Sequence, residues 1–235
     1  MQTPLKRFYK DVAVASRDGV HQVTLDGRVL RSPAKADLHF PSAALAEAVA
    51  EEWAGQTERI DAASMPLMTL SSTAVDYVRP RRTAIVEELV GFAGHDLVCY
   101  WCDEPQELLR RQQETWQPLL NWTALTFDAP LSVVRGVISE DQPPGSLEAL
   151  RREVAAIEDF PLMALLSTCQ ASGSLVIALA LLKGRLTAQE AFAASLLDEH
   201  YQMERWGRDA EALRRHEALQ EDLQQAERLL ALLKP

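Results

Sequence analysis

The stretch VAVASRDGVHQVTLDGRVLR, residues 12–31, decides the fold class. Three short runs rich in β-branched residues are separated by Asp18-Gly19 and Asp26-Gly27, and Asp-Gly is among the strongest sequence signals for a two-residue hairpin turn. The chain therefore predicts a small antiparallel sheet near its N-terminus. The expected strands are residues 12–16, 22–25 and 29–31.

The residues after this sheet change to a helical pattern. Residues 42–58 carry apolar side chains at helical spacing behind a serine cap, so this helix can cover one face of a sheet that would be marginally stable alone. A second helix is expected over 66–78, and the pattern after it is helical almost throughout. We therefore predict an α+β protein with two domains: a small antiparallel β-rich N-terminal domain with a covering helix, residues 1–80, and a mostly α-helical C-terminal domain, residues 81–235.

The most apolar part of the chain is LMALLSTCQASGSLVIALALL, residues 162–182. Its length would suffice to cross a bilayer. However, polar residues and a glycine interrupt it between Ser167 and Ser174, and no Lys or Arg flank marks an orientation. We expect one long helix that is buried in the core. A shorter segment, residues 131–138, is expected to be extended.

The composition restricts the class of function. The 235 residues are 47% hydrophobic, so the chain can bury substantial cores. A formal net charge of −10 disfavours non-specific binding to nucleic acid or to anionic lipid and favours a basic partner surface. An odd count of three cysteines does not suggest a disulfide scaffold, and the N-terminus resembles neither a signal nor a transit peptide. We expect a bacterial-type cytoplasmic protein.

Residues 187–206 are predicted to form one amphipathic helix, which opens with a capping box between Thr187 and Glu190. Glu199 falls in the middle of its apolar face. A carboxylate there is costly if it is buried and unpaired. Either a buried arginine or amide satisfies it, or the face lines a groove that another molecule fills. The face consists of Phe192, Leu196, Glu199, Met203 and Trp206.

Few residues offer catalytic chemistry. The sequence contains no glycine-rich phosphate loop and no zinc-protease or serine-hydrolase motif. Cys99 and Cys102 form a lone CxxC with His95 as the nearest histidine, while His200 and Glu204 lie one helical turn apart. A small metal-dependent or His/Glu-dependent hydrolase built on these residues is one alternative function.

The C-terminal residues offer another alternative. Packing of their apolar seam on the chain's own helices is the simpler interpretation, because two heptads are too few to be diagnostic of a coiled coil. Self-association as a helical scaffold is the alternative. The seam consists of Leu219, Leu223, Ala226, Leu230 and Leu233.

Five tryptophans are many for a chain with so few catalytic groups. Two of them lie beside acidic residues: Trp53 follows Glu52, and Trp206 lies two residues after Glu204. A large aromatic surface with a few polar anchors suits recognition of another protein. We therefore consider both tryptophans as candidate contacts with a partner.

Six strings, taken together, resemble one protein family. The resemblance is to the assembly chaperones for the α subunit of the catalytic head of F-type ATP synthase, which are found in mitochondria and α-proteobacteria. It covers nearly the whole chain in order. The strings are RFYKDVAV (7–14), VTLDGRVLRSP (23–33), LAEAVAEEWAGQ (45–56), MPLMTLSSTAVD (65–76), SGSLVIALALLKG (172–184) and LDEHYQMERWGRDAE (197–211).

The resemblance implies a binding protein rather than an enzyme. Such a chaperone holds the unassembled α subunit so that the surface destined for the β subunit does not aggregate. The resemblance also implies that the chain uses no cofactor and no metal and binds neither nucleic acid nor membrane. Glu199 matches a functionally sensitive acidic position of the family, and Trp53 matches the tryptophan of its EW-x-x-Q motif. We expect a monomer. The candidate partner-binding residues are Glu199, Trp53, Glu52, Trp206, Glu204 and Asp198.

Overall fold

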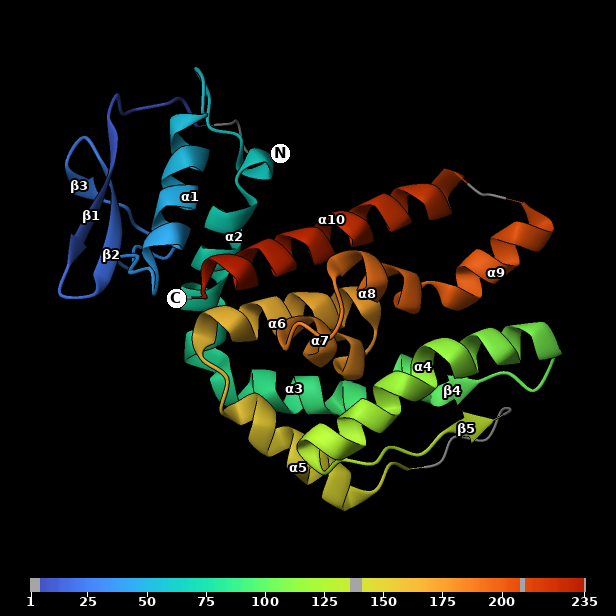
Figure 1. Ribbon diagram of the computed structural model, residues 1–235. Helices are drawn as coiled ribbons and strands as arrows, with labels where there is room; N and C mark the ends of the chain where they lie inside the picture. The colour runs from blue at the N-terminus through green and yellow to red at the C-terminus, as the bar shows by residue number, and fades with distance from the viewer. Residues whose placement is uncertain (1–4, 136–140, 208–209, 235) are drawn as a thin grey trace. The chain divides into compact units, whose positions relative to one another are not determined.

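The computed structural model describes residues 5–135, 141–207 and 210–234 (Figure 1). The chain forms two compact units. Unit 1 comprises Met1–Arg82, Asp159–Met163 and Arg228–Pro235, and unit 2 comprises Thr83–Glu158 and Ala164–Glu227. An antiparallel sheet followed by a mostly helical region confirms the predicted fold class. The domain boundary at residue 80 stays a prediction.

The sheet of unit 1 forms where the Asp-Gly turns predict it. Its order is β1-β2-β3, all antiparallel, with Val12 opposite Leu25. Both residues of each turn have positive φ, 53° and 77° in the first and 49° and 76° in the second. Mirror-image turns of this kind match the twist of the strands they join. The strands are β1 (Val12–Arg17), β2 (Val20–Leu25) and β3 (Arg28–Val29).

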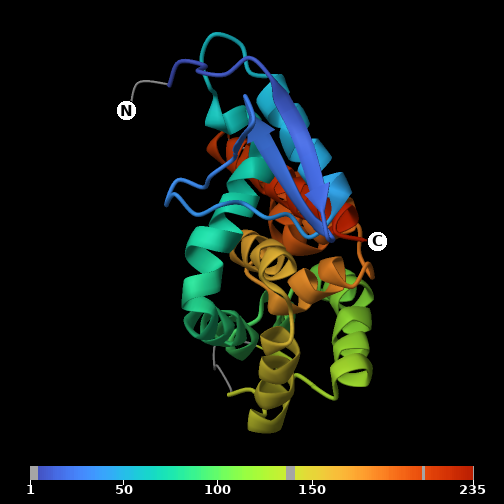
Figure 2. The same cartoon turned by 90° about the vertical axis from the view of Figure 1, so that its left-hand side faces the viewer.

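Helix α1 (Ala43–Ala54) covers one face of this sheet, and Figure 2 shows β1 and β2 in front of it. The Ser42 side chain caps the helix by accepting a hydrogen bond from the Leu45 amide at 3.2 Å. The helix ends at Gly55, three residues before the predicted end. Its inner side chains form the core of the unit with those of β2 and the following loop. They include Val23, Leu25, Leu38, Phe40, Leu45, Val49 and Trp53.

The predicted second helix of unit 1 is present but changes its winding. It begins with Pro66 in the first turn, as expected, and from Ala74 onward it continues through π and 3₁₀ turns. The elements are η1 (Ala62–Ser64), α2 (Pro66–Thr73), η2 (Ala74–Val78) and η3 (Arg79–Arg81).

Unit 2 is helical except for a two-stranded parallel sheet of β4 and β5. Part of the segment expected to be extended supplies β5, and residues 136–138 of that prediction lie outside the described residues. The remaining elements are α3 (Arg82–Gly94), η4 (Leu97–Cys99), β4 (Tyr100–Trp101), α4 (Gln106–Phe127), β5 (Val134–Arg135), α5 (Pro144–Ala155), α6 (Asp159–Ser172), α7 (Leu175–Leu182), α8 (Ala188–Ser195), α9 (Leu197–Trp206) and α10 (Ala210–Leu232).

The apolar run 162–182 is not one helix, so that prediction was wrong. Gly173 adopts a left-handed conformation (φ 71°) that ends α6, and Ser174 caps α7 by accepting from the Ile177 amide. The fully buried carboxylate of Asp96 stabilises the break, because it accepts hydrogen bonds from the Ser174 hydroxyl and from the Val176 amide. Over the described residues, no helix has the length and apolar character that a membrane span requires.

The predicted helix 187–206 is also broken into two. Its capping box is present as expected, but α8 ends at Ser195 and α9 begins at Leu197. The Ala194 carbonyl, which a continuous helix would use internally, accepts instead from the indole of Trp116 at 2.9 Å. The five residues of the apolar stripe therefore do not lie on one continuous helical face.

Candidate partner-binding site

Glu199 is paired within unit 2, and it lies at the surface rather than in a core. Its Oε2 accepts hydrogen bonds from the Arg215 guanidinium and from Nε2 of His216, each at 2.8 Å. The carboxylate side chain is 41% exposed. Burial alone would raise the pKa of Glu199, but the hydrogen bonds from His216 and Arg215 outweigh it and hold that pKa below its usual range. The carboxylate is therefore charged and half accessible.

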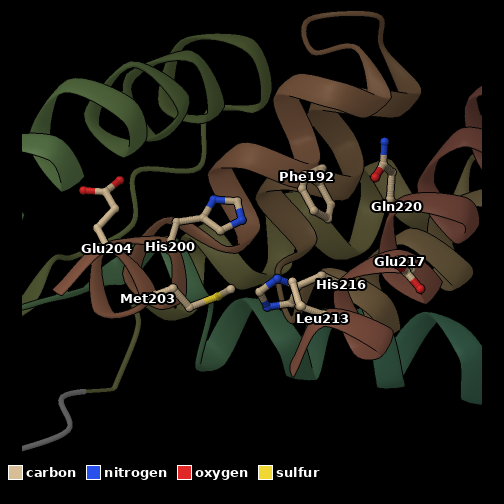
Figure 3. Close-up of a pocket in the computed structure, with 8 residues that line it drawn as sticks. All are labelled: Phe192, His200, Met203, Glu204, Leu213, His216, Glu217 and Gln220. Atoms are coloured by element: carbon tan, nitrogen blue, oxygen red, sulfur yellow. The ribbon is translucent and has the colours of Figure 1, made fainter. Parts of the chain in front are cut away.

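A groove of about 460 Å³ opens beside this pair, between residues of α8, α9 and α10. Figure 3 shows the side chains of His200 and Met203 projecting from α9 toward Phe192 and His216. The three rings form a cluster, with centroids 5.5 Å apart for the two histidines and 5.7 Å apart for Phe192 and His200. The groove is lined by Phe192, His200, Met203, Glu204, Leu213, His216, Glu217 and Gln220.

Side chains along another side of α9, with Glu204 at the edge of the groove, attach the helix to α4. Asp198 accepts from the Gln112 amide at 2.9 Å, and Glu204 accepts from the Arg111 guanidinium at 2.9 and 3.0 Å. Burial raises the pKa of Asp198. Between these contacts the Tyr201 ring packs under the guanidiniums of Arg111 and Arg205. These contacts fix the helix so that His200 and Met203 line the groove, with Glu199 beside it.

Trp206 is the most exposed aromatic side chain of α9. It is the last residue of that helix, one turn after Met203, and its side chain is 78% exposed. Gly207, with φ 92°, ends the helix directly behind it. An indole that is in water in both the folded and the unfolded chain contributes little to the free energy of folding, but it offers a large apolar area to a partner.

The other two predicted contacts, Glu52 and Trp53, lie on α1 in unit 1. Both carboxylate oxygens of Glu52 are occupied, because they accept from the amides of Leu67 and Met68 at 2.8 Å each and so cap the start of α2. Trp53 is 8% exposed, and the Tyr9 hydroxyl donates to its carbonyl at 2.7 Å. These residues serve the local fold, and their role as partner contacts stays a prediction.

The residues proposed for catalysis are dispersed or occupied. Cys99 is fully buried, and burial raises the pKa of its thiol and of the Cys102 thiol, so neither is a ready thiolate. His95 bonds the Tyr100 hydroxyl at 3.1 Å, and both oxygens of Glu204 accept from Arg111. Within the part of the chain that the structure describes, no group of three or more His, Cys, Asp or Glu side chains could hold a metal ion.

The first three residues of the predicted seam near the C-terminus are buried, whereas Leu230 and Leu233 are partly exposed. Leu219 is 8% exposed, and Leu223 and Ala226 are fully buried. Self-association through this seam would require these side chains to leave their core positions. The structure therefore favours the simpler interpretation, packing on the chain's own helices.

The sequence did not identify the groups that hold Glu199 in place. Arg215 and His216 lie sixteen and seventeen residues further along the chain, on α10. The only available signal was the basic run Arg214-Arg215-His216 in an otherwise acidic helix. That run alone does not indicate which carboxylate it faces.

Comparisons with known proteins place the chain in a family. The family model described as ATP12 chaperone protein matches residues 6–124. The solved structure of Atp12 from Paracoccus denitrificans is 40% identical, with a TM-score of 0.94 over 98% of this chain and 99% of that chain. The Agrobacterium tumefaciens protein Atu1473 is 38% identical, with a TM-score of 0.89 over 97% of this chain and 86% of that chain.

A curated relative, the mitochondrial protein atp12 of Schizosaccharomyces pombe, is 27% identical over 238 residues, which span 94% of this chain and 79% of that protein. The family model covers half of the chain, and the solved relatives cover nearly all of it at about two identical residues in five. These matches confirm the resemblance carried by the six strings. The chain belongs to the ATP12 chaperone family.

Proposed function

We propose that this chain is an assembly chaperone that holds the unassembled α subunit of F-type ATP synthase and shields the surface destined for the β subunit. Membership of a chaperone family supports the class of function. The six strings, which resemble α-subunit chaperones, support the choice of client. The observation that carries the proposal is the α8–α9–α10 groove, where carboxylates and aromatic rings meet, together with the exposed Trp206 at the end of α9.

The mechanism requires shielding rather than chemistry. An orphan subunit exposes an apolar interface larger than a monomer normally tolerates. The groove offers Phe192, Met203 and Leu213 as apolar contacts, and the exposed Trp206 at the end of α9 offers a further one. Release follows when the β subunit binds the same surface more tightly. No bond is made or broken, and the chain acts as a monomer without metal, cofactor or ATP.

Charge gives the groove its selectivity. Glu217 lines it and has no ion-pair partner among the described residues, so a client surface with Lys or Arg is attracted and oriented. Glu204 lines it and Glu199 lies beside it, and a basic group of the client would share these carboxylates with Arg111 and Arg215. Glu199 either contacts such a basic group directly or supports the groove by ordering α10 through Arg215 and His216. We place this activity in the bacterial cytoplasm and, for eukaryotic relatives, in the mitochondrial matrix.

The test is binding of isolated α subunit by wild type and by Glu199→Lys, followed by pull-down with and without competing β subunit. The variant should lose α-subunit binding. Its unfolding free energy should change by less than about 1 kcal/mol, because the Glu199 pair is partly solvated. Glu114→Lys is the matched control, since it reverses an exposed carboxylate that pairs with Arg110 away from the groove.

Three outcomes decide the proposal. Loss of binding in Glu199→Lys alone, with β subunit displacing α from wild type, supports it. Failure of wild type to bind α subunit overturns it. Global unfolding of Glu199→Lys would make Glu199 a structural pair, and Trp206→Ala, whose indole is already in water, would then test the groove without that complication.

A further inference from the structure

The outer edge of β1 is open. Strand β1 pairs with β2 on one side, and no strand among residues 5–135, 141–207 and 210–234 pairs with its other side. The Asp26 amide donates to the Asp11 carbonyl at 2.9 Å. Because bonded and non-bonded pairs alternate along an antiparallel ladder, the amides and carbonyls of Val12, Val14 and Ser16 point away from β2. Three donors and three acceptors therefore face the free edge.

This edge lacks the usual protection against pairing. Natural edge strands are blunted by lysine, proline, a bulge or very short length. Strand β1 reads VAVASR, with no proline and no lysine, and its single charge, Arg17, lies at the turn end. All six residues of β1 pair in unbroken register with β2, so no bulge interrupts it. The edge has the length and regularity to accept another strand.

A shallow groove of about 360 Å³ lies along this edge, between β1 and α1. Its floor is formed by small side chains, Ala50 and Ala54 among them, beside Val12 and Val14. Glu47 and Glu51 stand on its rim, one helical turn apart and both exposed. Among the described residues neither carboxylate has an ion-pair partner. The groove therefore combines room for modest apolar side chains with two uncompensated negative charges.

We propose that an extended segment of the client adds to β1 as a fourth strand of the sheet, with small apolar side chains in the groove and a Lys or Arg against Glu47 and Glu51. Strand addition of this kind gains affinity from main-chain hydrogen bonds and selectivity from alternate side chains. The inference rests on the proposed function for the identity of the client. It adds a second contact, on unit 1, to the one proposed for the groove on unit 2.

Hydrogen exchange with isolated ATP synthase α subunit as the probe tests the inference directly. Exchange of the amides of residues 12–17 should slow when α subunit binds, because free-edge amides become bonded. Glu51→Lys should weaken binding about fivefold to tenfold by removing the attraction and adding repulsion. Glu58→Lys, an equal charge change at an exposed position after α1, should leave affinity within about twofold of wild type.

Val12→Pro removes one free-edge donor without breaking a ladder bond, at the first residue of the strand where proline is best tolerated. Affinity for α subunit should fall about threefold to tenfold, which is the change expected when one intermolecular hydrogen bond is lost. Unchanged exchange over 12–17 with normal α-subunit binding overturns the inference and leaves the proposed function standing. Absence of wild-type binding overturns both. Slowing that depends on the chain's own concentration would show pairing with a second copy, and the inference would be wrong.

Discussion

Two acidic-aromatic pairs that look alike in sequence have opposite environments. In unit 1, Glu52 bonds two backbone amides and Trp53 is 8% exposed. In unit 2, Glu204 forms a surface ion pair with Arg111 and Trp206 is 78% exposed. The fold buries the Trp53 indole of the first pair and engages both Glu52 oxygens. In the second pair, Glu204 is held by Arg111 at the surface and the Trp206 indole stays in water. An acidic-aromatic motif thus indicates a partner contact only where the structure leaves its aromatic side chain exposed.

Asp96 is the most completely buried of the carboxylates that bond the chain's own backbone. Its substitution is therefore expected to have the largest effect on stability. Its carboxylate is fully buried and accepts from the amides of Val98 and Val176, at the starts of η4 and α7. Asp96→Ala should lower the free energy of unfolding by about 3–5 kcal/mol, because buried donors lose their acceptor. Urea unfolding measures this. Asp103→Ala, at an exposed position, should stay within about 0.5 kcal/mol of wild type.

The same carboxyl predicts a pH dependence of stability. Burial raises the pKa of Asp96 to about 6. Between about 3.9, its ordinary value in the unfolded chain, and 6, the folded chain keeps a proton that the unfolded chain has released. This contribution to the free energy of unfolding is therefore complete below that window and lost as pH rises through it, by up to about 3 kcal/mol.

Urea unfolding of wild type and Asp96→Asn at pH 4.5 and pH 7 isolates this contribution, because the amide cannot ionise. Carboxylates with lowered pKa, such as Glu199, oppose the trend in both proteins and cancel in the difference. The wild type should lose more stability than the variant on going to pH 7. Equal pH dependence in the two proteins would contradict the assignment.

Glu52→Ala tests whether the acidic residue of the unit 1 pair stabilises the fold. The substitution leaves the amides of Leu67 and Met68 without their acceptor at the start of α2. We expect a loss of about 2 kcal/mol in the free energy of unfolding. Glu51→Ala, one residue earlier and exposed, is the stability control. If Glu52→Ala kept full stability but lost binding to α subunit, the two pairs would be alike after all.

Features that depend on neighbouring residues could be predicted from the sequence, whereas features that depend on residues far along the chain could not. The Asp-Gly turns, the Ser42 cap and the capping box at Thr187 each depend on a few neighbouring residues, and all are present. The two breaks depend on hydrogen bonds from Ser174 to Asp96 and from Trp116 to the Ala194 carbonyl, and the bonded residues are 78 positions apart in each case. Periodicity within a segment cannot report such partners, so both runs read as single helices.

The candidate site shows the same limit. The aromatic and acidic residues of α9 were visible as a pattern, and the structure brings Met203 and Glu204 to one groove with residues of α10. The exposed fraction of each aromatic side chain could not be predicted, because residue type alone does not decide burial. Trp53 and Trp206 received the same interpretation from sequence and have exposed fractions of 8% and 78%.

Trp206→Ala sharpens the comparison on the unit 2 side. An indole that is mostly in water contributes little to the fold, so the melting temperature should hardly change. If the indole is buried by a client, affinity for α subunit should fall about tenfold, as for an aromatic residue important in an interface. Leu125→Ala is the control, since that side chain is 88% exposed on α4. Equal affinities for wild type and Trp206→Ala would remove Trp206 from the binding surface.

The substitution with the smallest expected effect on stability, Arg215→Met, distinguishes two roles for Glu199. Arg215→Met removes the guanidinium but keeps much of the side-chain length, and the pair it breaks is more than 40% exposed on both sides. Stability should therefore change by less than about 1 kcal/mol. If Glu199 contacts a basic group of the client, Arg215→Met leaves its carboxylate with His216 alone and more open to that group, so affinity should hold or rise, whereas Glu199→Gln should lower it. If Glu199 acts only by ordering α10 through Arg215, both variants should weaken binding alike, because each removes the same ion pair.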